Sequence, residues 1–199
     1  MVTTLPLPDR SRVDVAIAVT LTNAREVPVA ATLVAVFDDV RVAKAVTLAP
    51  GRNSLRLTLA EFAALRVAHP RLWWPNGYGD PALHDLTLTA SVDGARSDSN
   101  RSRFGIREIS YELSAFDGAG RLCRVEIAPA KSGGAPVIDG DHAHIHETAR
   151  RWAVSLHQGA ERAPGVTVLP ASPLSPFLVV RVNGMRIAVR GGAWGWTIS

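Results

Sequence analysis

Apolar side chains occupy every second position near the start of the chain: Val13, Val15, Ile17, Val19 and Leu21. A period of two places these side chains on one face of an extended segment, which predicts a half-buried β-strand. The same kind of run recurs at residues 29–37, 42–48, 55–59, 83–92 and 104–110. Turn-favouring pairs such as Pro50-Gly51 and Asp93-Gly94 separate the runs. Short strands with turn signals at this spacing predict an all-β fold, an antiparallel β-sandwich of the immunoglobulin-like kind.

The chain length limits what else can be present. A chain of 199 residues can bury one core, or one core with a large insertion. A complete (β/α)8 barrel needs roughly 250 residues by itself, so none fits. No apolar run reaches the roughly 18 residues that a membrane-spanning helix requires. Residues 1–10 lack the basic segment and apolar core of a signal peptide, so we expect neither membrane anchoring nor a leader in this segment.

Charge and cysteine content argue against nucleic-acid binding and against a fold held by disulfides. The net charge is +4 and the sequence pI is about 10.0, but the arginines are mostly single and lie among acidic residues. Nucleic-acid binding normally requires a concentrated basic surface, so we expect no nucleic-acid partner. The single cysteine, Cys123, rules out a disulfide within the chain.

The strand rhythm breaks down between residues 115 and 176, where glycines and prolines are frequent. We expect a loop-rich insertion there, because a separate domain of that size would need more apolar residues. Residues 146–157 contain one helical candidate, with four apolar side chains on one face: Ala149, Trp152, Ala153 and Leu156. Alternation returns at residues 177–182, and Asn183-Gly184 then predicts a tight turn into a C-terminal β-hairpin with residues 186–190.

Residues 72–79 read Leu-Trp-Trp-Pro-Asn-Gly-Tyr-Gly and form the most distinctive motif of the chain. Three large aromatic side chains in eight residues, fixed by Pro, Asn and Gly, predict a rigid loop with a large apolar surface. Two interpretations are open. Trp73 and Trp74 can stack on the C–H faces of sugar rings, or the loop can be a structural plug that seats the sandwich against its neighbours.

Three segments together resemble family 2 glycoside hydrolases, especially the β-mannosidase and exo-β-glucosaminidase branch. They are residues 72–79, residues 104–109 (Phe-Gly-Ile-Arg-Glu-Ile) and residues 182–196. The resemblance implies that residues 1–114 are the immunoglobulin-like sandwich between a sugar-binding jelly roll and a catalytic (β/α)8 barrel. Residues 115–176 are then an insertion, and residues 177–199 a hairpin leading into a barrel that is missing. Because the aromatic loop lies at a domain junction in that family, we favour the plug, and we expect Arg107 to form a structural ion pair.

The resemblance also gives a role to the C-terminal residues. Gly191-Gly192-Ala193-Trp194 corresponds to the end of the first barrel strand, and active sites of such barrels lie at the C-terminal ends of strands. Trp194 is therefore the residue expected to touch substrate, although Ala193 replaces the family's Asn or Asp. The relatives continue differently after Gly195. Deleting one base from codons for Gly-Met-Asp-Asp yields the Gly-Trp-Thr-Ile found at residues 195–198, so we expect a frameshift that truncated a longer enzyme.

The implied parent enzyme is a retaining hydrolase of terminal β-linked mannosyl, glucosaminyl or related sugars. Retention requires two carboxylates about 5–5.5 Å apart. Five glutamates match no catalytic motif of the family and are expected to be solvated: Glu108, Glu112, Glu126, Glu147 and Glu161. The chain is thus expected to be a non-catalytic fragment without cofactor, whose partners are the remaining domains of the parent and, in the parent, carbohydrate. A periplasmic or secreted parent stays open. The alternative function is a free-standing carbohydrate- or protein-binding sandwich module.

Three alternating histidines form a separate candidate. His142, His144 and His146 would share one face of a strand, and three imidazoles can bind zinc. Glycines flank the segment, and the run does not belong to the pattern of the resembled family. We therefore expect no functional metal site there.

Overall fold

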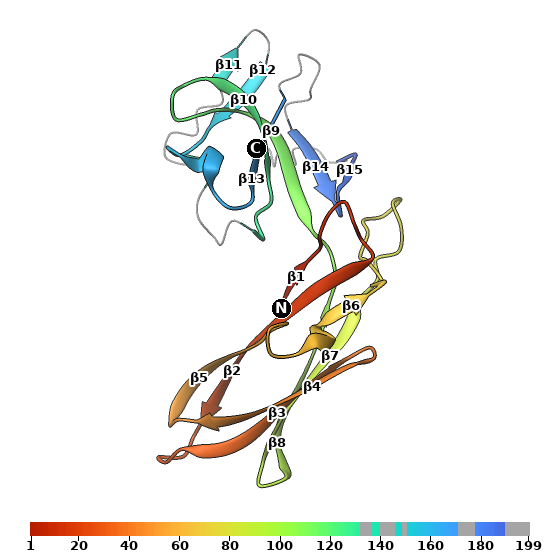
Figure 1. Ribbon diagram of the computed structural model, residues 1–199, viewed down its shortest axis with the longest axis vertical. Helices are drawn as coiled ribbons and strands as arrows, with labels where there is room; N and C mark the ends of the chain where they lie inside the picture. Colours follow the sequence, from red (N-terminus) through yellow and green to blue (C-terminus); the bar gives the residue numbers. More distant parts are fainter. Residues whose placement is uncertain (132–136, 140–145, 149–150, 171–177, 190–199) are drawn as a thin grey trace, which may run out of the picture. The chain divides into compact units, whose positions relative to one another are not determined.

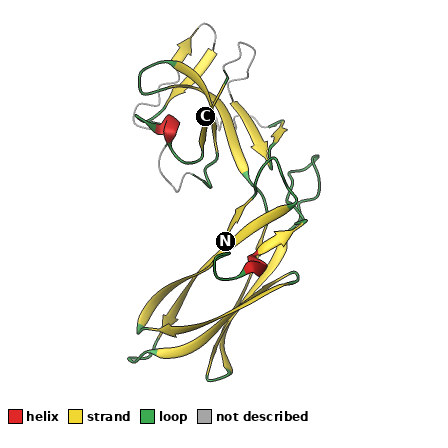
Figure 2. Ribbon diagram, in the orientation of Figure 1, coloured by secondary structure: helices red, strands yellow, loops and turns green. Residues whose placement is uncertain are grey.

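The computed structural model describes residues 1–131, 137–139, 146–148, 151–170 and 178–189. The chain divides into two compact units, an N-terminal unit of Met1–Glu108 and a C-terminal unit of Ile109–Ser199. Figure 2 shows that almost every regular element is a β-strand, which confirms the predicted all-β class. Within the described ranges, no helix is both long and apolar enough to span a membrane.

The N-terminal unit is a sandwich of two antiparallel sheets, drawn red to yellow-green in Figure 1. One sheet has the order β1-β2-β5, with β6 also paired to β2: β1 (Val2–Thr4), β2 (Arg12–Asn23), β5 (Gly51–Leu57) and β6 (Arg66–Ala68). The other has the order β4-β3-β7-β8: β3 (Val29–Phe37), β4 (Val40–Leu48), β7 (His84–Val92) and β8 (Ala95–Phe104). A short 3-10 turn, η1 (Ala63–Leu65), precedes β6. The predicted antiparallel sandwich is confirmed.

The alternating apolar positions fill the space between these two sheets. Val13, Val15 and Ile17 of β2 are at most 1% exposed, because every second side chain of the strand points inward. They belong to one buried cluster with residues of the opposite sheet, among them Leu33 and Phe37 of β3. The period-two pattern of the sequence therefore identifies the inner face of the sandwich.

One strand of the N-terminal unit differs from the sequence-based expectation. A strand was expected over residues 104–110, whereas the structure has β8 at Ala95–Phe104 and leaves residues 105–108 outside any strand. Nine of the ten β8 residues are exposed. Side chains on both faces of β8 are exposed, so the strand does not need an apolar alternation, and its sequence carries none. Among the described strands, β8 is the edge of its sheet and pairs with β7.

The C-terminal unit contains one sheet of order β11-β12-β9-β10-β13, to which β14 attaches through β9 and β15 through β14. The strands are β9 (Ile109–Phe116), β10 (Leu122–Ile127), β11 (His146–Thr148), β12 (Arg151–Ser155), β13 (Val166–Leu169), β14 (Leu178–Val182) and β15 (Met185–Ile187). β12 runs parallel to β9, and the other pairs are antiparallel. A 3-10 turn, η2 (Ala160–Arg162), precedes β13.

The helix expected over residues 146–157 is wrong, because β11 and β12 occupy most of this segment. Backbone pairing of β12 with β11 and with β9 holds the segment in the extended form, although apolar side chains at helical spacing had suggested a helix. Residues 113–160 also contribute a buried cluster of their own: Leu113, Ala115, Val125, Ile127, Val137, Leu156 and Ala160. The division between units falls after Glu108, whereas we expected the sandwich to extend to residue 114 and an insertion to follow.

The predicted C-terminal hairpin is confirmed. β14 and β15 are antiparallel neighbours, joined at Asn183 and Gly184. Both turn residues have positive φ, 51° and 77°, which suits the Asn-Gly pair of a two-residue turn. The structure adds that β14 pairs with residues 109–113 of β9, so the hairpin belongs to the sheet of the C-terminal unit.

We expect Leu33→Ala to lower the free energy of unfolding of the N-terminal unit by about 2–5 kcal/mol, because it leaves a cavity in the sandwich core. Leu33 is 1% exposed and belongs to the central cluster. Val27→Ala is the matched control, since Val27 is 61% exposed, and it should change stability by less than about 0.5 kcal/mol. Urea unfolding monitored by circular dichroism measures both. Equal effects of the two substitutions would contradict this assignment of the core.

Candidate functional site

The aromatic loop, residues 72–79, is held to the N-terminal unit by backbone pairing on both sides. Leu72 forms a parallel bridge to Ile106, and the Trp73 amide donates to the Ile106 carbonyl at 2.9 Å. On the other side Trp73 bridges Pro81, and the Trp74 amide donates to the Asp80 carbonyl at 3.0 Å. The two sequence motifs, residues 72–79 and 104–109, are therefore parts of one structural element.

Trp73 lies between a glycine and an arginine of the second motif. A Cβ atom on Gly105 would lie 3.0 Å from Cβ and 3.1 Å from Cγ of Trp73, so only glycine fits beneath the ring without displacement. The Arg107 guanidinium carbon lies 4.5 Å from the Trp73 ring centroid, within the range of a cation–π contact. Within the described residues the Arg107 side chain contacts this aromatic ring, and the ion pair expected for Arg107 stays a prediction.

Trp74 has a similar environment built from other residues. A Cβ atom on Gly79 would lie 2.9 Å from Cγ and Cδ1 of Trp74, and the φ angle of 152° at Gly79 also favours glycine. The Arg10 guanidinium carbon lies 5.6 Å from the Trp74 ring centroid. Both tryptophans are half-buried. Part of the aromatic surface that a sugar ring would need is thus in contact with the protein's own side chains.

The entry into the aromatic loop is fixed by His84, which is 1% exposed. Its Nδ1 atom forms a close hydrogen bond with Asp38 in the β3–β4 turn, and Nε2 lies 2.9 Å from the Arg71 carbonyl. The imidazole also stacks on Phe104, with ring centroids 5.2 Å apart. Both ring nitrogens lie within hydrogen-bonding distance of oxygen atoms, so the imidazole is held on two sides. Sequence reasoning missed His84, because a single histidine in a strand carries no distinctive pattern.

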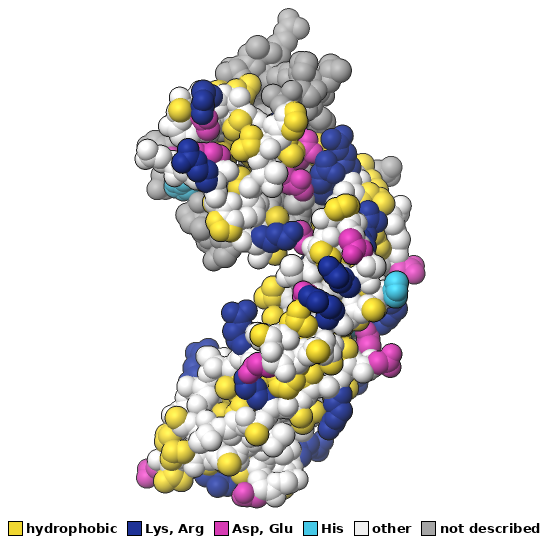
Figure 3. Space-filling view, in the orientation of Figure 1, with side chains coloured by type: hydrophobic (Ala, Val, Ile, Leu, Met, Phe, Trp, Pro, Cys, Tyr) yellow, Lys and Arg dark blue, Asp and Glu magenta, His cyan; other side chains and the backbone are white. Residues whose placement is uncertain are grey.

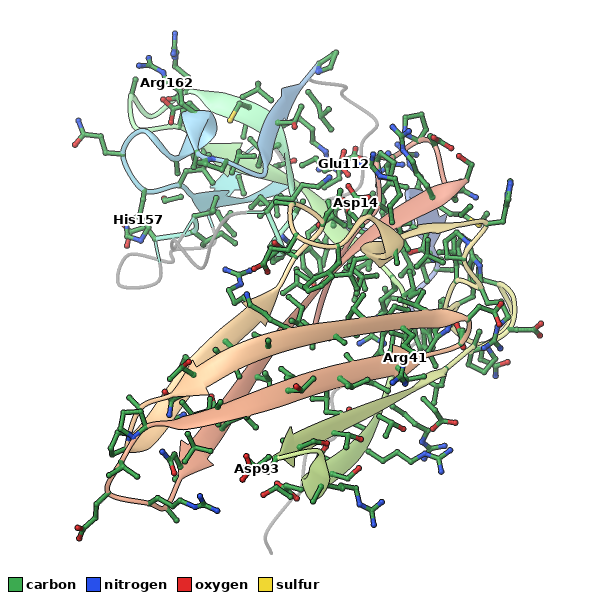
Figure 4. The ribbon with its side chains drawn as sticks, turned by 60° about the horizontal axis from the view of Figure 1, so that its bottom comes forward. Asp14, Arg41, Asp93, Glu112, His157 and Arg162 are labelled. Carbon is green, nitrogen blue, oxygen red and sulfur yellow. The ribbon has the colours of Figure 1, made fainter. Side chains whose placement is uncertain are left out.

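A buried charge cluster occupies one face of the C-terminal sheet. Glu112 of β9 is 4% exposed, although it was expected to be solvated. Its Oε1 accepts from Arg124 Nε at 3.1 Å, and its Oε2 accepts from Arg181 at 2.8 Å. Arg186 lies 3.6 Å from the same Oε2 atom. Figure 4 labels Glu112 on its strand.

The ionisation of Glu112 follows from this environment. Burial raises the pKa of the Glu112 carboxyl, but the hydrogen bonds and positive charges of Arg181 and Arg124 outweigh burial and hold the pKa below its ordinary value. Glu112 is therefore an ionised acceptor. It lacks the raised pKa that a general acid in glycoside hydrolysis requires.

The other glutamates have varied environments. Glu108 is 4% exposed, so the expectation that it is solvated is also wrong. Glu126 is half-buried and accepts from the Ser110 hydroxyl at 2.6 Å, and Glu161 lies 3.8 Å from Arg162. The side chain of Glu147 lies outside the described residues.

The remaining candidates gain no support as sites. Trp194, His142 and His144 lie outside the described residues, and of His146 the structure describes the backbone in β11. Where side chains are described, no three His, Cys, Asp or Glu side chains cluster in a way that could hold a metal ion.

Burial and the nearby charges of Asp117 and Glu161 raise the pKa of the Cys123 thiol, which disfavours the reactive thiolate. Figure 3 shows the Lys and Arg side chains of the visible face in small groups among acidic and apolar ones.

Comparison with known proteins finds a family model and several relatives that match this chain. The model of the family described as "Glycosyl hydrolases family 2" matches residues 1–107. An exo-β-D-glucosaminidase of Streptomyces avermitilis is 30% identical over 120 residues, which is 60% of this chain and 13% of that protein. Beta-mannosidase B of Aspergillus flavus is 44% identical over 87 residues, which is 43% of this chain and 10% of that protein.

Among solved structures, the exo-chitosanase CsxA of Amycolatopsis orientalis matches with a TM-score of 0.49 and 23% identity. That match covers 69% of this chain and 14% of CsxA. The chain thus spans only a small fraction of the length of each of these relatives.

We expect Gly105→Ala to lower the free energy of unfolding by about 1–3 kcal/mol, because the new methyl group meets the Trp73 ring. The tryptophan emission spectrum should also shift as Trp73 moves. In a Trp73→Leu background the same Gly105→Ala change should cost less, since the smaller side chain leaves room. A double-mutant cycle by urea unfolding measures the difference. If the two substitutions change the free energy of unfolding additively, the methyl group at position 105 does not clash with Trp73.

We expect His84→Asn to cost about 1–3 kcal/mol of stability, because it removes the hydrogen bonds of a buried imidazole to Asp38 and to the Arg71 carbonyl, together with its stacking on Phe104. His69→Asn is the matched control: His69 is exposed with a φ of 46°, a conformation that Asn tolerates. Thermal melting should separate the two variants clearly. If both variants melt like the wild type, His84 does not hold the entry into the aromatic loop.

Proposed function

This chain belongs to family 2 of the glycosyl hydrolases, and we propose that it is a non-catalytic β-sandwich region that scaffolds the catalytic barrel of a longer enzyme. The observation that carries the proposal is the match of the family model to residues 1–107, which is almost the whole N-terminal unit. The longer enzyme would act on a terminal β-linked sugar with retention of configuration. Relatives named as glucosaminidases and mannosidases support this substrate class.

The contacts of the aromatic loop support a scaffold role over a sugar-stacking role. Arg107 lies over Trp73, and Gly105 packs beneath it. A sugar that stacked on this ring in the usual way would have to displace a guanidinium group that already contacts the aromatic face. A loop pinned by backbone hydrogen bonds and closed by its own arginine is suited to present a rigid surface to another domain.

The glutamates of the N-terminal unit support our proposal that this chain is not catalytic. The unit contains three glutamates: Glu26, Glu61 and Glu108. Glu26 is exposed in a turn, Glu61 is paired with Lys44, and Glu108 is buried. In the C-terminal unit, Glu112 is bound by arginines as an anion. Hydrolysis in the longer enzyme would therefore use two glutamates of its barrel, and Trp194 is the residue of this chain that we propose to face the sugar.

We expect the chain itself to show no turnover of nitrophenyl β-mannoside or β-glucosaminide, and no saturable change in tryptophan fluorescence with mannose, glucosamine or their β-linked oligomers at millimolar concentration. Trp73→Ala and Trp74→Ala serve as controls in the titration. Turnover that survives repurification would overturn the non-catalytic role. A saturable response that disappears in Trp73→Ala or Trp74→Ala would instead favour the free-standing carbohydrate-binding module.

A further inference from the structure

The buried charge cluster of the C-terminal unit has no part in the proposed scaffold role of the N-terminal unit. We infer that Glu112 is a positioning residue, whose carboxylate binds Arg124 and Arg181 and thereby fixes the β14–β15 hairpin on the face of β9. The inference about the hairpin stands on contacts within one unit. Its consequence for an enzyme rests on the proposed function, in which the hairpin precedes the segment of Trp194.

Strand register places the interacting groups on one face of the sheet. Glu112 is directly opposite Val179 of β14 on one side and Glu126 of β10 on the other. Arg124 is opposite Ser114, and Arg181 is opposite Ser110. Because side chains alternate between faces, the even-numbered residues of β9 share a face with Arg124, Glu126 and Arg181. The odd-numbered residues Leu113 and Ala115 belong to the apolar cluster.

Arg124 binds Glu112 firmly from the side of β10. It is 3% exposed, and its Nε atom donates to the carboxylate at 3.1 Å. A second nitrogen donates to the Glu112 carbonyl at 3.3 Å, and a third donates to the Ser114 hydroxyl at 3.1 Å. These contacts hold the Glu112 side chain in one position, which leaves its second oxygen directed at β14.

Arg181 connects that second oxygen to the hairpin turn. One of its terminal nitrogens donates to Glu112 Oε2 at 2.8 Å, and the other donates to the Gly184 carbonyl at 3.3 Å. Arg186 of β15 is opposite Arg181 in register and lies 3.6 Å from the same carboxylate oxygen. A single carboxylate therefore contacts residues of both hairpin strands, and through Arg181 it is linked to the turn.

The balance of charge explains why this position needs a carboxylate. Three arginines from three strands converge here: Arg124, Arg181 and Arg186. Without the negative charge of Glu112, these three positive charges would repel one another on this face. Removing one member of a buried ion pair costs more than the pair gains, because the remaining charge stays desolvated. The hairpin strands β14 and β15 have five and three residues, so few backbone hydrogen bonds are available to offset that cost.

Glu112→Gln tests the inference, with Glu126→Gln as matched control on the same face of the same sheet. We expect Glu112→Gln to raise amide hydrogen exchange in residues 178–187 by roughly tenfold or more, while the N-terminal unit keeps its protection. Glu126→Gln should leave hairpin exchange within about twofold of the wild type. Unchanged hairpin exchange in Glu112→Gln, or the same increase in both variants, would overturn the inference.

A second variant covers the case in which Glu112→Gln fails to fold. Arg181→Gln removes the hydrogen bonds of Arg181 to Glu112 and to the Gly184 carbonyl but keeps the Glu112–Arg124 pair, so the sheet should form and the hairpin should lose protection. Exchange that rises equally over β9, β10 and the hairpin would show a general loss of stability and contradict a positioning role.

The pH dependence of hairpin exchange distinguishes an ion pair of Glu112 from a role in packing alone. Because the pKa of Glu112 is lowered from 4.5 in the folded protein, its contribution is present above that pH and is lost as pH falls below it. Hairpin protection, corrected for intrinsic exchange, should therefore decline below about pH 4.5 more steeply in the wild type than in Glu112→Gln. A wild-type profile that is flat to pH 2.5 would count against the ion pair. None of these outcomes depends on whether the chain belongs to an active glycosidase.

Discussion

The hydrogen bond from the Trp73 amide to the Ile106 carbonyl joins the two most distinctive segments of the N-terminal unit. It brings residues 105–107 beside the aromatic loop, so that Gly105 packs against the indole and Arg107 lies over it. His84 acts on the same loop from its other end, because it binds the carbonyl of Arg71 just before the loop begins. The loop owes its position to backbone contacts, and the side chains then fill the space that those contacts define.

The two units differ in the kind of side chain that they bury on the faces of their sheets. In the N-terminal unit the inner faces of two sheets bury apolar residues against each other. In the C-terminal unit one face of the sheet is apolar, while the other buries Glu112 and Arg124. Burying charge is costly, and each charge here is offset by direct hydrogen bonds to an opposite charge or to a backbone carbonyl. Such a face tolerates fewer alternative arrangements than an apolar one, since each donor must meet its acceptor.

How far the sequence predicted the structure depended on the kind of signal each segment carries. The strand over residues 29–37 was predicted with its observed limits, and the Asn183-Gly184 hairpin was also found, because alternation and turn chemistry are local. β8 was missed because an exposed edge strand carries no apolar pattern. β12 was taken for a helix because its backbone pairing with β9 and β11, which the sequence does not show, decides for the extended form. The buried state of Glu112 could not be read from the sequence, because its arginines lie 12 and 69 residues away along the chain.

The polar composition of β8 has a consequence for how the protein behaves at high concentration. β8 ends its sheet, so the outer side of its backbone is available to pair with a strand of another molecule. Arg96, Arg101 and Arg103, together with Asp98, stand along this edge and are exposed. An incoming strand would have to strip water from these charges before any backbone hydrogen bond could form. The charged residues of β8 therefore have two effects. They remove the apolar pattern by which the strand could be predicted, and they disfavour pairing of this edge with another molecule.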